Sequence, residues 1–168
     1  MAGENIKEIK FNNKNGYNLL TFPSPVETSW PENNTVYCRM FTSTPAADTI
    51  IIFVPGWART NLTAEEGMCR QFKQEGIDTC LITKPFHQER KPAFTFSGEL
   101  FISGNIFLTV MNFRQLVAEL RFLIHVCRKK YKTIGMLGMS SGGFQTALAA
   151  DVEDIDFYFP IRLLECSF

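Results

Sequence analysis

This sequence of 168 residues lacks long apolar runs and a signal segment. No apolar run reaches the roughly 18 residues that a helix needs to cross a bilayer. The first residues, MAGENIKEIK, contain no apolar core of a secretory signal. We therefore expect a cytoplasmic protein without a membrane span.

An excess of charge of either sign is also missing. The 17 lysine and arginine residues balance the 17 aspartate and glutamate residues, so the formal net charge is zero. Proteins that bind nucleic acid or anionic membrane surfaces through electrostatics carry an excess of positive charge. The composition therefore gives no support for a nucleic-acid partner, and we expect none.

Paired cysteines are the third missing feature. The five cysteines are Cys38, Cys69, Cys80, Cys127 and Cys166. None of them shows the CxxC spacing that is typical of zinc and redox sites, and no secretory signal accompanies them. We expect reduced thiols, no metal site and no cofactor.

The residues that are present favour one folded domain. Hydrophobic residues make up 45% of the chain and charged residues 20%, which excludes extensive disorder. A chain of this length is long enough for one packed core and too short for two. We expect a single domain over residues 1–168.

The segment 133–150, TIGMLGMSSGGFQTALAA, has the pattern of a strand, a tight turn and a helix. An apolar, strand-like run ends at Leu137, and the alanine-rich run after Gly143 favours a helix. Gly138 and Gly142 bracket Ser140 in the spacing GxSxG. This order predicts a sharp turn with a serine at its apex.

Glycines at this spacing let a strand and a helix pass close together around a strained serine. The helix N-terminus then points at Ser140, and the backbone N–H of Ser141 becomes a donor to an oxyanion. An ordinary turn of small residues, or a turn that holds a phosphate, would have a similar pattern. No lysine follows the glycines, which argues against a Walker-type phosphate loop.

A second site feature follows the segment TIIIFV at 49–54. This run is almost entirely β-branched or aromatic without polar alternation, which predicts a strand covered on both faces. It leads into Pro55-Gly56-Trp57-Ala58 at the carboxyl edge of the sheet, where open α/β folds bind ligands. Trp57 or Ala58 could supply a second oxyanion donor. The alternative is that the Pro-Gly pair only ends the strand.

The remaining pattern completes an α/β arrangement. Residues 5–44 alternate strand-like pieces with turns, which predicts antiparallel strands at one edge of a sheet. A capping box at 63–66 predicts a helix that ends at Gly76, and a buried strand follows at 77–83. The order strand-helix-strand implies a parallel pair with a right-handed crossover. We expect a last strand over 155–161.

A long helix is predicted over 106–131. Its expected apolar face consists of Ile106, Val110, Phe113, Val117, Leu120, Ile124 and Cys127. Its expected polar face carries Arg114, Arg121, His125 and Arg128. We expect His125 to be a surface residue near the amino edge of the sheet, away from Ser140.

The loop at 84–105 is longer than a connection between two elements requires, and loops of this length tend to be functional or mobile. It contains His87, Arg90 and four phenylalanines. Its aromatic residues would form either a pocket wall or the packing beneath a surface loop.

In this order the features resemble an α/β hydrolase: a three-layer α/β/α sandwich with a mostly parallel sheet and antiparallel N-terminal edge strands. Three segments resemble the branch of the abhydrolase-domain-eighteen type. They are 85–90 (PFHQER), 97–104 (SGELFISG) and 138–143 (GMSSGG). The resemblance implies a serine hydrolase of the carboxylesterase or acyl hydrolase type with a small acyl or ester substrate. It implies Ser140 as the nucleophile, with oxyanion donors at Ser141 and at Trp57 or Ala58.

The chain departs from this family in its catalytic triad. The family order is serine, acid, histidine, and no residue after Gly143 is a histidine. A serine hydroxyl without a general base is a poor nucleophile. Two candidates remain. His87 follows a strand that lies two places from the Ser140 strand in the family order, roughly 10 Å away by strand spacing. Glu165 follows the last expected strand and is the candidate for the acid.

We interpret the chain as an incomplete hydrolase, truncated after the strand that follows the Ser140 turn and inactive by itself. An open apolar sheet edge would then favour self-association or a partner chain. A non-catalytic interaction or scaffold protein with the same fold is the alternative. A nucleotide-binding α/β domain that holds phosphate in the 138–142 turn is a third possibility, which the missing glycine and lysine patterns disfavour.

Overall fold

The structure is a computed structural model, and it describes residues 9–14 and 16–161. Its strands are β1 (Lys10–Lys14), β2 (Tyr17–Pro23), β3 (Thr35–Phe41), β4 (Thr49–Val54), β5 (Asp78–Ile82), β6 (Thr133–Met139) and β7 (Phe157–Ile161). Its helices are α1 (Thr63–Gln74), α2 (Ile106–Arg128) and α3 (Ser141–Ala150), with short 3₁₀ turns η2 (Pro31–Asn34) and η3 (Gln88–Arg90). The expected order of elements is confirmed, with small shifts at the ends.

The described strands form one mixed sheet in the order β1-β2-β3-β5-β4-β6-β7. The pairs β1–β2, β2–β3 and β3–β5 are antiparallel. The strands β5, β4, β6 and β7 run parallel to one another. In the parallel part Val54 at the end of β4 is paired with Gly138 on β6. The predicted α/β sandwich is therefore confirmed, and the segments after β4 and β6 begin side by side.

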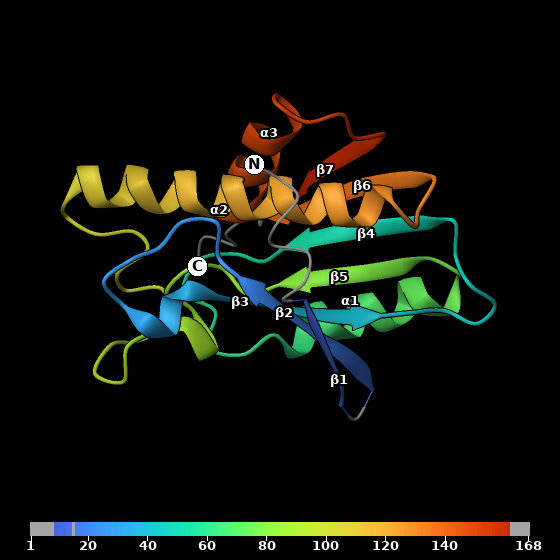
Figure 1. Cartoon of the computed structure of the whole chain (residues 1–168), viewed down its shortest axis with the longest axis horizontal. Helices are drawn as coiled ribbons and strands as arrows, with labels where there is room; N and C mark the ends of the chain where they lie inside the picture. The colour runs from blue at the N-terminus through green and yellow to red at the C-terminus, as the bar shows by residue number, and fades with distance from the viewer. Residues whose placement is uncertain (1–8, 15, 162–168) are drawn as a thin grey trace, which may run out of the picture.

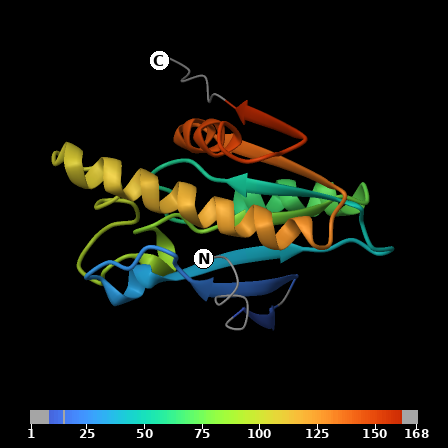
Figure 2. The same ribbon diagram turned by 45° about the horizontal axis from the view of Figure 1, so that its top comes forward.

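Helices cover both faces of the sheet (Figures 1 and 2). The central strand β4 has apolar residues on both faces, because Ile50, Ile52 and Val54 pack in the core cluster that includes α2. Ile51 and Phe53 pack in the second cluster, with α1. Burial on both faces explains why β4 lacks the polar alternation of a half-exposed strand.

The predicted capping box of α1 is wrong. The N-cap residue is Leu62, which has no side-chain cap, and Thr63 is already inside the helix. Its amide donates to Oδ1 of Asn61 at 3.2 Å. The side chain of Glu66, the acidic residue of the predicted box, pairs with Arg39 of β3 at 3.4 Å instead of capping the helix. The tertiary ion pair thus replaces the local cap.

The predicted apolar face of α2 is only partly correct. Its buried apolar residues are Leu116, Leu120, Leu123, Ile124 and Cys127. Ile106 and Val110 are 74% and 46% exposed, because the N-terminal part of α2 projects past the carboxyl ends of β4 and β5 (Figures 1 and 2). The helix therefore has core contacts in its second half and an open apolar surface in its first.

Two features are absent from the described residues, a membrane-spanning helix and a cluster of metal-binding side chains. None of the helices there combines the length and apolarity that a membrane span requires. Within the same residues, no three histidine, cysteine or acidic side chains gather in a way that would hold a metal ion.

Candidate active site

Ser140 occupies the single residue between β6 and α3. Its backbone has φ 52° and ψ −121°. A positive φ is unfavourable for a residue with a side chain, and it costs on the order of 1–3 kcal/mol. The amide of Ser140 is held by the carbonyl of Ile161 on β7 at 2.8 Å. The turn therefore keeps Ser140 in a strained conformation with its side chain exposed.

Glycines allow α3 to lie against the ends of two strands. A Cβ atom on Gly142 would come within 2.2 Å of the Val54 carbonyl oxygen at the end of β4. A Cβ atom on Gly138 would come within 2.5 Å of the Gly142 carbonyl oxygen. Only glycine fits at these two positions without moving backbone. The N-terminus of α3 is consequently pressed against the segment that follows β4.

That segment, residues 55–58, forms a corner next to Ser140. A Cβ atom on Gly56 would lie 3.6 Å from Cβ of Ser140. As the first residue of α3, Ser141 has a backbone N–H without an intrahelical acceptor. Among the hydrogen bonds of the described residues, none uses the amide of Trp57. The structure thus brings Ser140, Ser141 and the corner together.

The loop after β5 holds this corner at three successive residues. Nε1 of Trp57 donates to the Gly98 carbonyl at 2.8 Å. The amide of Ala58 donates to Nε2 of His87 at 3.3 Å. Oγ of Ser97 donates to the carbonyl of Arg59 at 2.6 Å. The loop therefore clamps the corner.

His87 has both ring nitrogens occupied in this arrangement. Nδ1 lies 2.8 Å from the carbonyl of Pro85, which can only accept, so Nδ1 carries the proton and Nε2 accepts from Ala58. Burial is the main cause that lowers the pKa of His87 to about 3, and the nearby Lys84 lowers it further. His87 is a neutral, buried residue that fixes the corner. It has no free nitrogen with which to take a proton from Ser140.

Lys84 is a site residue that the sequence analysis missed. Its side chain is fully buried, and Nζ lies 3.1 Å from Oγ of Ser141 and 5.0 Å from the centre of the Phe101 ring. Burial lowers its pKa to about 7. The available signal was a lysine almost directly after a buried strand, in the segment CLITKP at 80–85.

Arg90 lies in the core, where its contacts hold the fold together. It is fully buried and forms a bidentate ion pair with Glu119 of α2, with N–O distances of 2.7 and 2.8 Å. It also donates to the carbonyls of Thr83 at 3.0 Å and of Asn33 at 2.6 Å. Arg90 thereby ties the loop to α2 and to η2. The segment PFHQER is thus part of the framework that supports the corner.

Other residues that could titrate or attack are exposed, outside the described residues, or unreactive. His125 is exposed and lies 3.6 Å from Glu153, as expected for a surface residue. Glu165 lies outside the described residues. Burial raises the pKa of the Cys69 thiol to about 11 and that of Cys127 to about 12, so both stay protonated and poor nucleophiles at neutral pH.

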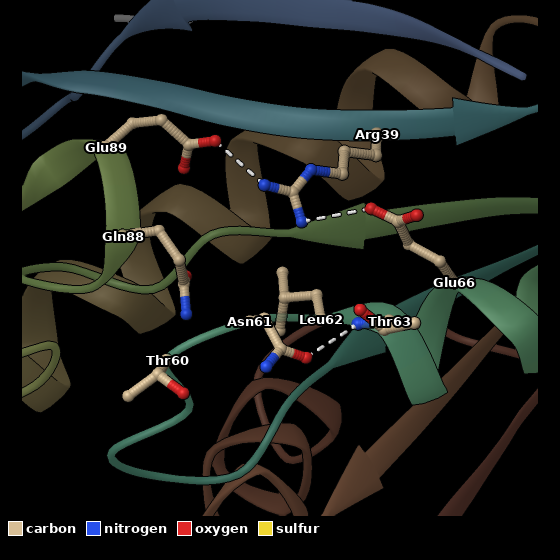
Figure 3. A pocket seen from close by; sticks show the side chains of 8 residues that line it. All are labelled: Arg39, Thr60, Asn61, Leu62, Thr63, Glu66, Gln88 and Glu89. Atoms are coloured by element: carbon tan, nitrogen blue, oxygen red, sulfur yellow. Dashed lines mark hydrogen bonds and ion pairs between the residues drawn. The ribbon is translucent and has the colours of Figure 1, made fainter. Parts of the chain in front are cut away.

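A polar hollow of about 480 Å³ lies between the segment that follows the corner, residues 60–63, and residues 88–89 of the loop after β5 (Figure 3). Its lining residues are Arg39, Thr60, Asn61, Leu62, Thr63, Glu66, Gln88 and Glu89. Arg39 projects between two carboxylates, at 2.8 Å from Glu89 and 3.4 Å from Glu66 (Figure 3). Because its only lining arginine is already paired with two lining carboxylates, the hollow offers no free positive charge to a ligand.

Apolar side chains lie exposed on α3 and on the projecting half of α2. They are Phe144 and Leu148 on α3, and Ile106, Phe107 and Val110 on α2. The rings of Phe113 on α2 and Phe144 on α3 lie 5.8 Å apart, so the two helices share this surface. Phe144 comes only four residues after Ser140 along the chain. The surface is suited to contact an apolar group next to Ser140.

A family model described as alpha/beta hydrolase domain containing 18 matches residues 50–157. A cold-adapted esterase from an Arctic intertidal metagenomic library has a TM-score of 0.63 and 13% identity, and the match covers 90% of this chain and 63% of the esterase. An acetyl xylan esterase from Paenibacillus sp. R4 has a TM-score of 0.61 and 14% identity, with coverages of 92% and 53%.

A soluble variant of the monoglyceride lipase of Saccharomyces cerevisiae has a TM-score of 0.57 and 10% identity, with coverages of 95% and 45%. None of the curated proteins matched the chain. At these identities the likeness to the solved structures shows the fold. The chain spans less than two thirds of the length of each of the three structures.

Proposed function

The chain belongs to the family described as alpha/beta hydrolase domain containing 18, and we propose that it carries the nucleophile and the oxyanion hole of a serine hydrolase. In this proposal Oγ of Ser140 attacks the carbonyl carbon of an ester or related acyl substrate. The bond from Oγ to the acyl carbon forms, the C–O bond to the leaving group breaks, and the hydroxyl proton ends on the leaving oxygen to give the alcohol. The acyl group stays on Ser140 until water removes it as the acid.

One observation carries the proposal: Ser140 has a strained, left-handed backbone at the exposed end of β6, against the corner at 55–58. Strain of this kind persists where the surroundings enforce it, and it clusters at functional sites. The amides of Ser141 and Trp57 are the donors that we assign to the oxyanion. The amide of Ala58 is not assigned, because it already donates to His87.

The substrate class follows from the surface around Ser140. Apolar side chains of α2 and α3 lie exposed on this side of the molecule, and Phe144 is 56% exposed. They are suited to contact an acyl chain of small or medium length. The esterase names of two of the similar structures agree with an ester substrate.

The hydroxyl proton of Ser140 needs a base, and the described residues offer no free histidine for it. His87 has both nitrogens engaged, and His125 is paired with Glu153. We therefore expect slow turnover by this chain alone. This observation also favours the second candidate function, a non-catalytic interaction protein that keeps the hydrolase fold.

Labelling with a fluorophosphonate separates the two functions, because it needs one attack and no turnover. We expect the wild type to be labelled on the peptide that contains Ser140, and Ser140→Ala to abolish the label. Ser141→Ala is the matched control, since it keeps the backbone N–H and should still be labelled. A folded wild type that takes no label, or a label that survives Ser140→Ala, would support the non-catalytic function instead.

A further inference from the structure

Lys84 is a fully buried lysine that the proposed reaction leaves without a role. None of the ion pairs within residues 9–14 and 16–161 includes it. Buried lysines are rare unless they are paired, because transferring the ammonium from water is costly. An unpaired lysine in the core therefore needs a physical explanation.

The contacts of Lys84 lead to the candidate active site. Nζ lies 3.1 Å from Oγ of Ser141, the first residue of α3. The ring of Phe101, 5.0 Å from Nζ, favours the charged form through its negative face. The N-terminus of a helix is already positive, and an ammonium beside it adds a second positive influence. Together they favour a negative charge in front of the Ser141 amide.

We propose that Lys84 is a positioning residue that sets the pH dependence of acyl transfer at Ser140. Its ammonium acts through Ser141 to stabilise the oxyanion at the N-terminus of α3, and this effect is lost when the ammonium loses its proton. The inference rests on the proposed function and assigns one more residue to it.

The effect has a defined window of pH. Burial lowers the pKa of Lys84 to about 7, so the charge is present below this value and lost above it. The groups around Lys84 do not change charge in this window. His87 stays neutral above pH 3, and Arg90 is held in a buried pair with Glu119. Ser141 and Phe101, which contact Nζ, are uncharged.

The size of the effect can be bounded. Removal of a direct oxyanion donor typically lowers the rate by 10²–10³. Lys84 acts one residue further away, so we expect its charge to raise the rate by about tenfold, which corresponds to roughly 1.4 kcal/mol at the conversion for a factor of ten.

The test is the rate of fluorophosphonate labelling between pH 5.5 and 9 for the wild type and Lys84→Met. In this reaction the bond from Oγ to phosphorus forms, the P–F bond breaks, fluoride leaves and the hydroxyl proton passes to water. The ratio of the two rates removes any pH effect on the reagent. We expect a ratio of about ten at pH 5.5 that falls to about one above pH 8.5, with its midpoint near 7.

Three further variants make the test specific. Lys129→Met removes an exposed lysine at the far end of α2 and should give a ratio of one at every pH. Ser141→Ala removes the hydroxyl that accepts from Nζ and stabilises the ammonium, so Lys84 should lose its proton at a lower pH. When its rate replaces that of the wild type in the ratio, the midpoint of the pH profile should therefore lie at a lower pH. Lys84→Gln keeps a hydrogen-bond donor without the charge, and it replaces Lys84→Met if that variant does not fold.

The outcomes separate this inference from the function on which it rests. A ratio that is constant with pH means a structural role for Lys84, and a ratio that rises with pH means a general base; either overturns the inference while the hydrolase proposal stands. A ratio for Lys129→Met that falls in the same way also overturns it. A wild type that takes no label at any pH overturns both proposals.

Discussion

Replacing Gly142 by alanine should separate the two parts of the proposed oxyanion hole. The new Cβ atom would lie 2.2 Å from the Val54 carbonyl oxygen, about 1.2 Å closer than the 3.4 Å at which ordinary contact begins. The Pro55 carbonyl oxygen, at 2.7 Å, is also too close. Because these are backbone atoms of the segment that leads into the corner, the strain cannot be relieved by a rotamer change. Either α3 or the corner must move by about 1 Å.

A shift of this size has two measurable consequences. Overpacking of a tight site costs about 1–3 kcal/mol, so urea denaturation should show a free energy of unfolding lower by that amount. A misplacement of about 1 Å in an active site can cost about a hundredfold in rate. We therefore expect fluorophosphonate labelling of Ser140 to slow by one to two orders of magnitude.

The matched control for Gly142→Ala is Gly67→Ala. Gly67 lies inside α1, and a Cβ atom there would have no neighbour within 4 Å. Alanine has the higher helix propensity by about 1 kcal/mol, so this variant should be as stable as the wild type or more stable, with unchanged labelling. Wild-type labelling and stability in Gly142→Ala would refute the close approach of α3 to β4. Normal labelling with reduced stability would show that the close approach of α3 to β4 does not position the oxyanion donors.

Four further predictions concern stability and association. Ser140→Gly should be more stable than Ser140→Ala by about 1 kcal/mol in urea denaturation, because glycine accepts the positive φ; equal stabilities would mean that the turn is not strained. Glu119→Gln should lower the free energy of unfolding by about 3–5 kcal/mol, because it leaves Arg90 charged and unpaired in the core; a loss below 1 kcal/mol would contradict the buried pair. Between pH 6.5 and 3 the unfolded chain binds a proton at His87 that the folded chain does not. The stability of the wild type should therefore fall relative to His87→Asn as the pH drops from 6 to 4, by up to about 1.4 kcal/mol per pH unit, and parallel curves would exclude a buried neutral histidine. Phe159 on the edge strand β7 is 58% exposed, so we expect concentration-dependent association in sedimentation that Phe159→Lys weakens; a monomeric wild type at all concentrations would remove that expectation.

The parts of the site that local sequence could predict are the turn at Ser140 and the corner at 55–58. Both depend on short-range geometry, since glycines at fixed spacing after an apolar strand allow few backbone paths. The family resemblance predicted one part of the strand order, namely that the strand before His87 lies two places from the Ser140 strand. The observed order agrees with this. It places β4 between β5 and β6, and the pairing of Val54 with Gly138 brings the two site segments together.

The parts that sequence could not predict depend on contacts between distant segments. Periodicity along α2 does not reveal that the helix outruns the sheet, so Ile106 was expected in the core and is exposed. The tautomer of His87 is set by carbonyl and amide groups of two different loops, Pro85 and Ala58. Lys84 contacts Ser141, which lies 57 positions away in the chain. Patterns along the sequence do not reveal contacts between residues that lie this far apart in the chain.

Lys84 and His87, two buried polar residues behind the site, share one environment. Lys84 and His87 both pack on the ring of Phe101, at 5.0 and 5.3 Å, in a region shielded from water. In such surroundings the charge of one group strongly affects the other, and the charge on Lys84 helps to keep His87 neutral. A neutral His87 can accept from the Ala58 amide, whereas a protonated one would repel it. The same lysine that faces the N-terminus of α3 thus also stabilises the clamp on the corner. The two sides of the proposed oxyanion hole are therefore linked through one buried charge, and a variant at Lys84 should alter both the electrostatics of α3 and the acid stability of the corner.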